Sequence, residues 1–158
     1  MNSTKSDINT EFKADFAVRT HEVDKSKLIT VPSLLMLMQE ASMQQVVHLK
    51  ASVWDMENLK ISWVLLRKEL TVFRLPKLGE QVRIITYPAG FDRVFAYRDY
   101  KVYDEKGDLL AFAGSTWTLL NTETRKMERI PSMFFHLKPP ENQEHLAIPD
   151  RKIPEVET

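Results

Sequence analysis

The sequence contains no cysteine and only four glycines among its 158 residues. Without cysteine there can be no disulfide, no thiolate nucleophile and no cysteine-ligated metal site. With so few glycines the chain has no glycine-rich loop of the kind that cradles phosphates. No apolar run approaches the roughly 20 residues of a membrane span, so none is expected. Residues 1–15 carry several charges and no apolar core, so we expect no signal peptide.

The charges balance, with 22 Lys and Arg against 22 Asp and Glu. A general nucleic-acid-binding protein needs a basic excess or stripe, so no nucleic-acid partner is expected. The four histidines show no metal-ligand spacing, and we therefore expect no metal and no cofactor. The length suits one domain with a sizeable core, and the composition indicates a globular, cytoplasmic protein.

One segment, 32–50, has the pattern of a long helix. Five apolar residues run together from Leu34 to Met38, so the apolar surface extends almost all the way round the first turns. A helix of that kind must be surrounded. Gln39 and Glu40 follow directly, which places a carboxylate inside or beside the apolar wrap. Such an acid must be paired, hydrated or chemically employed, so Glu40 is either a catalytic base or a hydrogen-bonded buried acid.

After Leu59 the sequence has the composition and turn signals of strands. Counting one strand before the helix, we expect strands over 12–19, 61–75, 81–87, 93–103, 109–121 and 126–130. The order of strand, long helix and antiparallel strands is that of the hotdog fold. The fold class is therefore α+β, with a long central helix wrapped by a curled antiparallel sheet of five to six strands. Such a sheet leaves an edge strand, so we expect a homodimer or a higher oligomer.

The ends of the chain differ in character from its middle. We expect a disordered N-terminus over 1–11, the hotdog domain over 12–131 and a proline-rich arm over 132–158. Phe134 and Phe135 are too apolar for a free linker, so part of this arm is expected to pack on the body.

Short segments along the domain resemble the acyl-acyl-carrier-protein thioesterase family. The resemblance covers residues 12–131 and is to the first of two tandem hotdog domains. It is carried, in the family's order, by Phe16–Arg19, Glu22–Asp24, Met38–Ala41, Trp63–Arg67, Thr86–Pro88, Tyr97–Asp99, Ser115–Trp117 and Thr124–Arg125.

The resemblance implies a hydrolase that cleaves the thioester of a fatty acyl chain with acyl carrier protein or coenzyme A. In the family, the second domain carries an Asp-x-Asn-x-His motif before its helix and an acid on the next strand. Asp24 stands in the place of that Asp, and Glu69 in the place of the strand acid. Ser26 and Leu28 replace the Asn and the His. Hydrolysis by this chain is therefore expected to use carboxylates and water.

Thioester hydrolysis needs a base and N–H donors directed at the developing oxyanion. The start of the helix offers such amides, and because Pro32 has no N–H, Ser33 and Leu34 are the expected donors. Glu40 can be the base if the thioester lies against the middle of the helix. For the acyl pocket we expect Leu35, Met38 and Trp63.

Each candidate has a plainer interpretation. Asp24 can simply turn the chain before the helix, and Glu69 can pair with a base on a solvated face. Because Ser26 and Leu28 remove the amide and the imidazole, the chain can also be a non-catalytic acyl-binding or partner-regulating module. A hydratase or dehydratase ranks last, since it needs a histidine near the helix start and this sequence offers none there.

Overall fold

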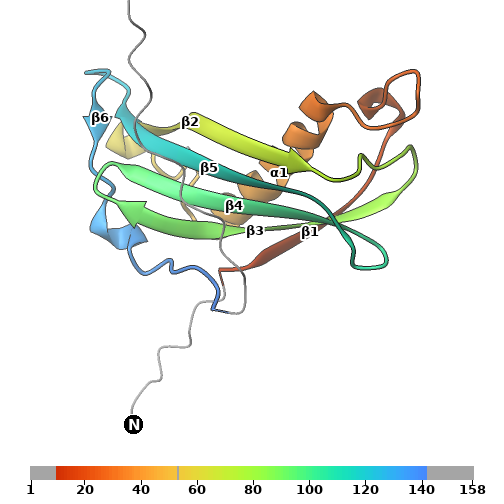
Figure 1. The fold of residues 1–158 in the computed structure, drawn as a ribbon. Helices are drawn as coiled ribbons and strands as arrows, with labels where there is room; N and C mark the ends of the chain where they lie inside the picture. Colours follow the sequence, from red (N-terminus) through yellow and green to blue (C-terminus); the bar gives the residue numbers. More distant parts are fainter. Residues whose placement is uncertain (1–9, 53, 142–158) are drawn as a thin grey trace, which may run out of the picture.

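The computed structural model describes residues 10–52 and 54–141 (Figure 1). Most of the predicted N-terminal segment (1–9) and most of the predicted C-terminal arm (142–158) lie outside the described residues. In chain order the elements are β1 (Phe12–Ala17), η1 (Thr20–Glu22), α1 (Val31–His48), η2 (Glu57–Leu59), β2 (Ile61–Val72), β3 (Gln81–Asp92), β4 (Phe95–Asp104), β5 (Leu109–Asn121), β6 (Met127–Glu128) and η3 (Ser132–Phe134), where η marks a short 3-10 helix.

All neighbouring strands of the sheet run antiparallel, in the order β1-β3-β4-β5-β2, and β6 pairs with one end of β5. Helix α1 lies across one face of this sheet, and β1 and β2 form its two edges (Figure 1). The sheet does not close on itself. The predicted architecture of one long helix packed on an open antiparallel sheet is therefore confirmed.

Helix α1 begins and ends within two residues of the predicted limits, because its start and stop signals are local. Thr30 has an extended backbone, and its hydroxyl accepts a hydrogen bond from the N–H of Ser33 at 3.2 Å, as an N-cap residue does. Pro32 sits in the first turn, where its missing N–H costs nothing. The helix ends at His48, and Lys50 adopts a left-handed backbone with φ +55°.

Strand β3 differs most from the prediction. It does not stop at Pro88 but continues to Asp92. Pro88 pairs with Arg98, and the register shifts between Pro88 and Gly90, where a β-bulge absorbs the irregularity. Gly90 has φ +144°, a backbone conformation that favours glycine. A proline at a bulge removes no essential ladder hydrogen bond, so it does not end the strand.

The core consists of two clusters of apolar side chains. The first packs the N-terminal half of α1 against the sheet through Leu34, Leu37, Met38 and Ala41. The second lies at the C-terminal end of the helix and contains Ala51, Met56, Ala96, Leu119, Ile130, Phe134 and Leu137. The expected packing of the segment after residue 131 is confirmed for Phe134, whose ring lies 5.8 Å from that of Trp63.

The sheet packs on α1 as predicted, but the expectation that the helix is surrounded on all sides is wrong for the single chain. The sheet covers only one side of the helix, so Met36 is 67% exposed although it lies within the apolar run. Glu40 is exposed as well. A stripe of α1 thus faces away from the sheet, and the carboxylate of Glu40 needs no buried partner.

The packing of α1 on the sheet can be tested by a substitution in the first cluster. Replacing Leu34, which is fully buried, by Ala should lower the free energy of unfolding by roughly 2–5 kcal/mol, because it leaves a cavity in the core. Met127→Ala, on the exposed side of β6, should change it by less than about 0.5 kcal/mol. Urea denaturation followed by circular dichroism measures both, and equal effects of the two substitutions would contradict the packing described.

Candidate functional site

A cavity of about 190 Å³ lies between the C-terminal half of α1 and the sheet. The helix contributes Gln39, Ser42, Met43 and Val46, whose spacing of three and four residues places them on one helical face. The remaining lining comes from the loop after the helix, the strands and the segment after β6, mainly Leu49, Ala51, Trp63, Phe91, Ala96, Trp117, Phe134 and Leu137. Among the described residues that form it there is no carboxylate and no histidine.

One buried cation, Arg98 of β4, also lines the cavity. Only 9% of this residue is exposed. Its Nη1 donates to Oε1 of Gln45 at 2.5 Å and to Oγ1 of Thr86 at 3.1 Å. Burial lowers the pKa of Arg98, yet a guanidinium stays protonated in proteins. No carboxylate within 10–52 or 54–141 forms an ion pair with it, so its charge is met by neutral oxygen atoms.

The partners of Arg98 are themselves held in place. The side-chain amide of Gln45 donates to the carbonyl of Thr10 at 2.5 Å, which fixes its oxygen toward the guanidinium. The hydroxyl of Thr86 donates to the carbonyl of Asp99 at 2.9 Å. This network joins the segment before β1, the helix and the neighbouring strands β3 and β4, and it orients Arg98 through two acceptors.

Lys68 of β2 approaches the same region. Its Nζ lies 4.1 Å from the centroid of the Tyr100 ring, within the range of a cation–π contact. Burial, with a smaller contribution from the charge of Arg98, lowers the pKa of Lys68 to about 8. Ser115 donates to the carbonyl of Arg98 at 3.0 Å and accepts from the indole of Trp117 at 2.8 Å. The apolar cavity therefore borders a polar, cationic region of the sheet.

Asp24 lies in the exposed loop before α1. It accepts hydrogen bonds from the backbone N–H of Ser26 at 2.8 Å and from the Ser26 hydroxyl. These bonds lower the pKa of Asp24, so it is ionised at neutral pH. The same contacts turn the chain toward the helix, as the plainer interpretation holds.

The other two candidate acids lie on different surfaces. Glu40 accepts from the side-chain amide of Gln44 at 3.0 Å on the exposed stripe of α1. Glu69 forms an ion pair with Arg67. Because neighbouring strand residues point to opposite faces and Lys68 contacts Tyr100 on the helix side, Glu69 points away from the helix. Asp24, Glu40 and Glu69 thus each have a partner of their own, and the three acids form no shared cluster of hydrogen bonds or ion pairs among the described residues.

The expected backbone donors already have partners. The N–H of Ser33 donates to the Thr30 hydroxyl, and the N–H of Leu34 donates to the Thr30 carbonyl at 2.9 Å. In this structure Thr30 therefore accepts from both of the N–H groups that were expected to bind the oxyanion.

The three residues expected for the acyl pocket separate into two groups. Trp63 lines the cavity, and its indole donates to the carbonyl of Ala51 at 3.2 Å. Leu35 and Met38 pack in the first core cluster, and neither lines the cavity. The helix is rotated so that the face beginning at Gln39 is turned toward the cavity.

Sequence reasoning missed Arg98 as a site residue. The signal was present, since Arg98 occupies the same strand face as Ala96, Tyr100 and Val102, which are all buried. A cation at an apolar position of an alternating strand indicates either a buried ion pair or a ligand site.

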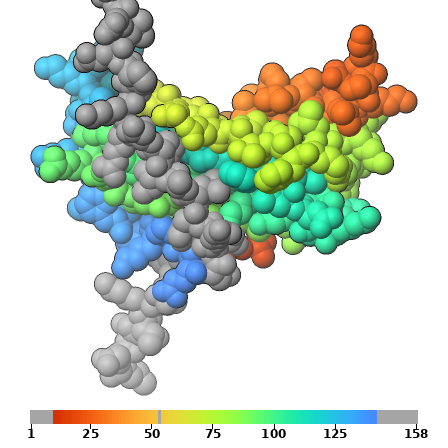
Figure 2. All heavy atoms as spheres, viewed as in Figure 1, coloured from red at the N-terminus to blue at the C-terminus, as the bar shows by residue number. Residues whose placement is uncertain are grey.

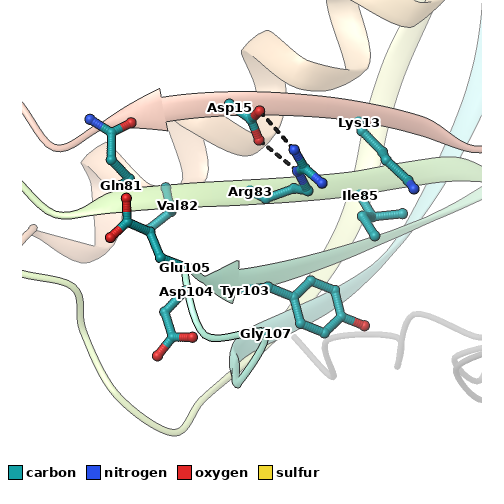
Figure 3. Close-up of a pocket in the computed structure, with 10 residues that line it drawn as sticks. All are labelled: Lys13, Asp15, Gln81, Val82, Arg83, Ile85, Tyr103, Asp104, Glu105 and Gly107. Atoms are coloured by element: carbon teal, nitrogen blue, oxygen red, sulfur yellow. Dashed lines mark hydrogen bonds and ion pairs between the residues drawn. The ribbon is translucent and has the colours of Figure 1, made fainter.

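A larger hollow of about 570 Å³ lies on the surface along β1, β3 and the end of β4 (Figure 3). It is open, and two of its charges pair with each other: Arg83 forms two hydrogen bonds with Asp15, at 2.8 and 3.0 Å. Figure 3 shows this ion pair bridging the two strands. None of the expected site residues borders it, so the cavity beside α1 is the better candidate.

The His, Asp and Glu side chains of the described part of the chain form no group that could hold a metal ion. In the same residues, no helix has the length and apolarity needed to cross a membrane.

Comparison with known proteins places this geometry in a family. Residues 9–137 match the acyl-ACP thioesterase N-terminal domain. A curated relative, the chloroplastic oleoyl-acyl carrier protein thioesterase 2 of Arabidopsis thaliana, is 27% identical over 92% of this chain and 44% of its own length. The chain thus spans less than half the length of the curated relatives it matches.

Solved structures show the same fold. A putative oleoyl thioesterase from Lactobacillus plantarum superposes with a TM-score of 0.81 at 22% identity, over 96% of this chain and 60% of that one. The 12:0-ACP thioesterase of Umbellularia californica gives 0.76 at 24% identity, over 94% and 60%. The predicted hotdog fold is confirmed. The chain belongs to the acyl-ACP thioesterase family, and the part of that family it matches is the N-terminal domain.

Proposed function

We propose that this chain binds a fatty acyl chain in the cavity beside α1 and serves the hydrolysis of its thioester with acyl carrier protein or coenzyme A. The observation that carries the proposal is the mainly apolar cavity that lies between helix and sheet in a member of this family. Aromatic and aliphatic side chains such as Trp63, Trp117 and Phe134 suit a hydrocarbon chain. Met43 adds an adaptable thioether at the helix side.

For the acid that activates water in hydrolysis, we propose one of the two candidates on or next to α1. Glu40 lies on the exposed stripe of α1, and Asp24 precedes the helix. Glu69 remains a weaker candidate, because it points away from the helix. None of them borders the cavity in the single chain, so a complete site needs a further surface beside the stripe of α1.

We propose that a second copy of the chain supplies this surface. Strand β2 is 12 residues long and has a neighbour on one side only within the described sheet, and its Leu65 and Leu66 are exposed. Figure 2 shows the yellow-to-lime atoms of β2 at the surface. An edge strand of this length invites pairing with another chain. The exposed Met36 and Val47 of α1 would be covered in the same assembly, and Glu40, which lies between them, would be enclosed.

A second candidate function is acyl binding without catalysis. It is favoured by the absence of any carboxylate or histidine among the described residues that line the cavity. In that case the chain binds the same acyl thioesters and does not turn them over.

We also propose limits for the domain and a location in the cell. We take 12–131 as the hotdog domain and 132–158 as an arm whose first residues pack on it, supported by the burial of Phe134 and Leu137. Placement in the cytoplasm stays a prediction from composition.

The assembly can be tested by adding a charge to the exposed stripe. Met36→Lys and Leu65→Lys should each shift the protein from dimer to monomer in sedimentation velocity, because a charge would be buried at the interface. Met127→Lys, also at an exposed position, should leave the dimer intact. A wild-type protein that sediments as a monomer at all concentrations would contradict the proposed second copy.

Catalysis can be tested by release of free thiol from acyl-carrier and acyl-coenzyme A thioesters of short to long chains. Glu40→Gln should lower kcat by about a hundredfold or more while leaving the binding of the thioester unchanged, because it removes the base and keeps the shape. The kcat values of Asp24→Asn and Glu69→Gln, measured in the same assay, show which of the three acids is the catalytic base. Binding without turnover by the wild-type protein would instead favour the acyl-binding module.

A further inference from the structure

The guanidinium of Arg98 has hydrogen-bond donors that the fold does not use. A guanidinium carries five N–H groups, and the hydrogen bonds of Arg98 all come from Nη1. Within the described residues, Nε and Nη2 have no acceptor. Arg98 lines the cavity, so its side chain borders the space that a ligand would occupy.

An unsubstituted hydrocarbon chain is a poor partner for the part of the cavity lining that Arg98 forms. It would displace water from Nε and Nη2 and offer no acceptor in return, and an unsatisfied charged donor is costly to bury. An oxygen atom on the chain would accept from the same donors. A full negative charge is not required, because the fold already meets Nη1 with the neutral oxygen atoms of Gln45 and Thr86.

We propose that the cavity prefers acyl chains that carry a hydroxyl or keto oxygen, which accepts hydrogen bonds from Arg98. The inference rests on the acyl-binding function proposed above and adds a specificity-determining residue to it. The aromatic and aliphatic lining binds the hydrocarbon part of the chain, and Arg98, held by Gln45 and Thr86, selects the oxygen. Because these two partners fix the guanidinium, its free edge is already oriented before the ligand arrives.

The test compares one acyl chain with and without a hydroxyl. N-acetylcysteamine thioesters of dodecanoic acid and of its hydroxy isomers are mixed rapidly with the wild-type chain, and the tryptophan emission is recorded before turnover. Trp63 and Trp117 line the cavity and report on binding. At least one isomer should bind about tenfold more tightly than the unsubstituted chain, as expected for a hydrogen bond to a charged group.

Two outcomes with the wild-type protein would overturn the inference. Equal affinity for all the isomers and the plain chain would remove the oxygen preference and leave the acyl pocket in place. Failure of every thioester to bind would remove the preference together with the proposed function.

Substitutions of Arg98 test whether this residue causes the preference for a chain that carries an oxygen atom. Arg98→Met should abolish the tenfold preference and leave the plain chain bound at least as tightly, because the lining becomes apolar throughout. Arg98→Lys keeps a charge but loses the planar fork, and should weaken the preference. Arg129→Met, the same substitution at an exposed position, should retain it. A folded Arg98→Met protein that still prefers a hydroxy chain would contradict the assignment.

Discussion

The hydrogen bond between Gln45 and Arg98 joins the helix to the centre of the sheet, and the shape of the candidate site depends on it. Gln45 is oriented by the carbonyl of Thr10, and Arg98 is oriented further by Thr86. A helix with one long apolar run could pack against a sheet in several rotations. A polar contact of defined direction selects one of them, because in the alternatives the buried guanidinium would lose the oxygen of Gln45 as an acceptor. In the selected rotation, Met38 faces the core.

The same rotation separates the place that can bind an acyl chain from the groups that could hydrolyse its thioester. The cavity is lined mainly by apolar side chains and by one cation, whereas Glu40 is exposed and does not line it. One chain thus contains a binding cavity and an uncovered stripe. In the proposed dimer a second copy would cover both the uncovered stripe and the edge strand β2, so binding and assembly are linked in this account.

The fold could be predicted from the sequence to the extent that its signals are local. The limits of α1 follow from Thr30 and Pro32, and β5 follows from an apolar run between turns. Strand β3 could not be read past Pro88, because the bulge that tolerates this proline depends on its partner on β4. The exposure of Glu40 could not be predicted either, since a run of apolar residues does not say which side of a helix the sheet covers. Arg98 showed a usable signal, a cation within an alternating apolar face, but its meaning required knowledge of the neighbours.

The central claim is that the cavity beside α1 holds an acyl chain. The most direct measurement is photo-crosslinking with a dodecanoyl thioester that carries a diazirine at the end of its chain, followed by mass spectrometry of the labelled peptides. The account predicts saturable labelling in the C-terminal half of α1 and in the segment around Phe134, which meet at the cavity. Labelling confined to the surface hollow around Asp15 and Arg83, or no labelling that an unlabelled thioester can displace, would contradict it.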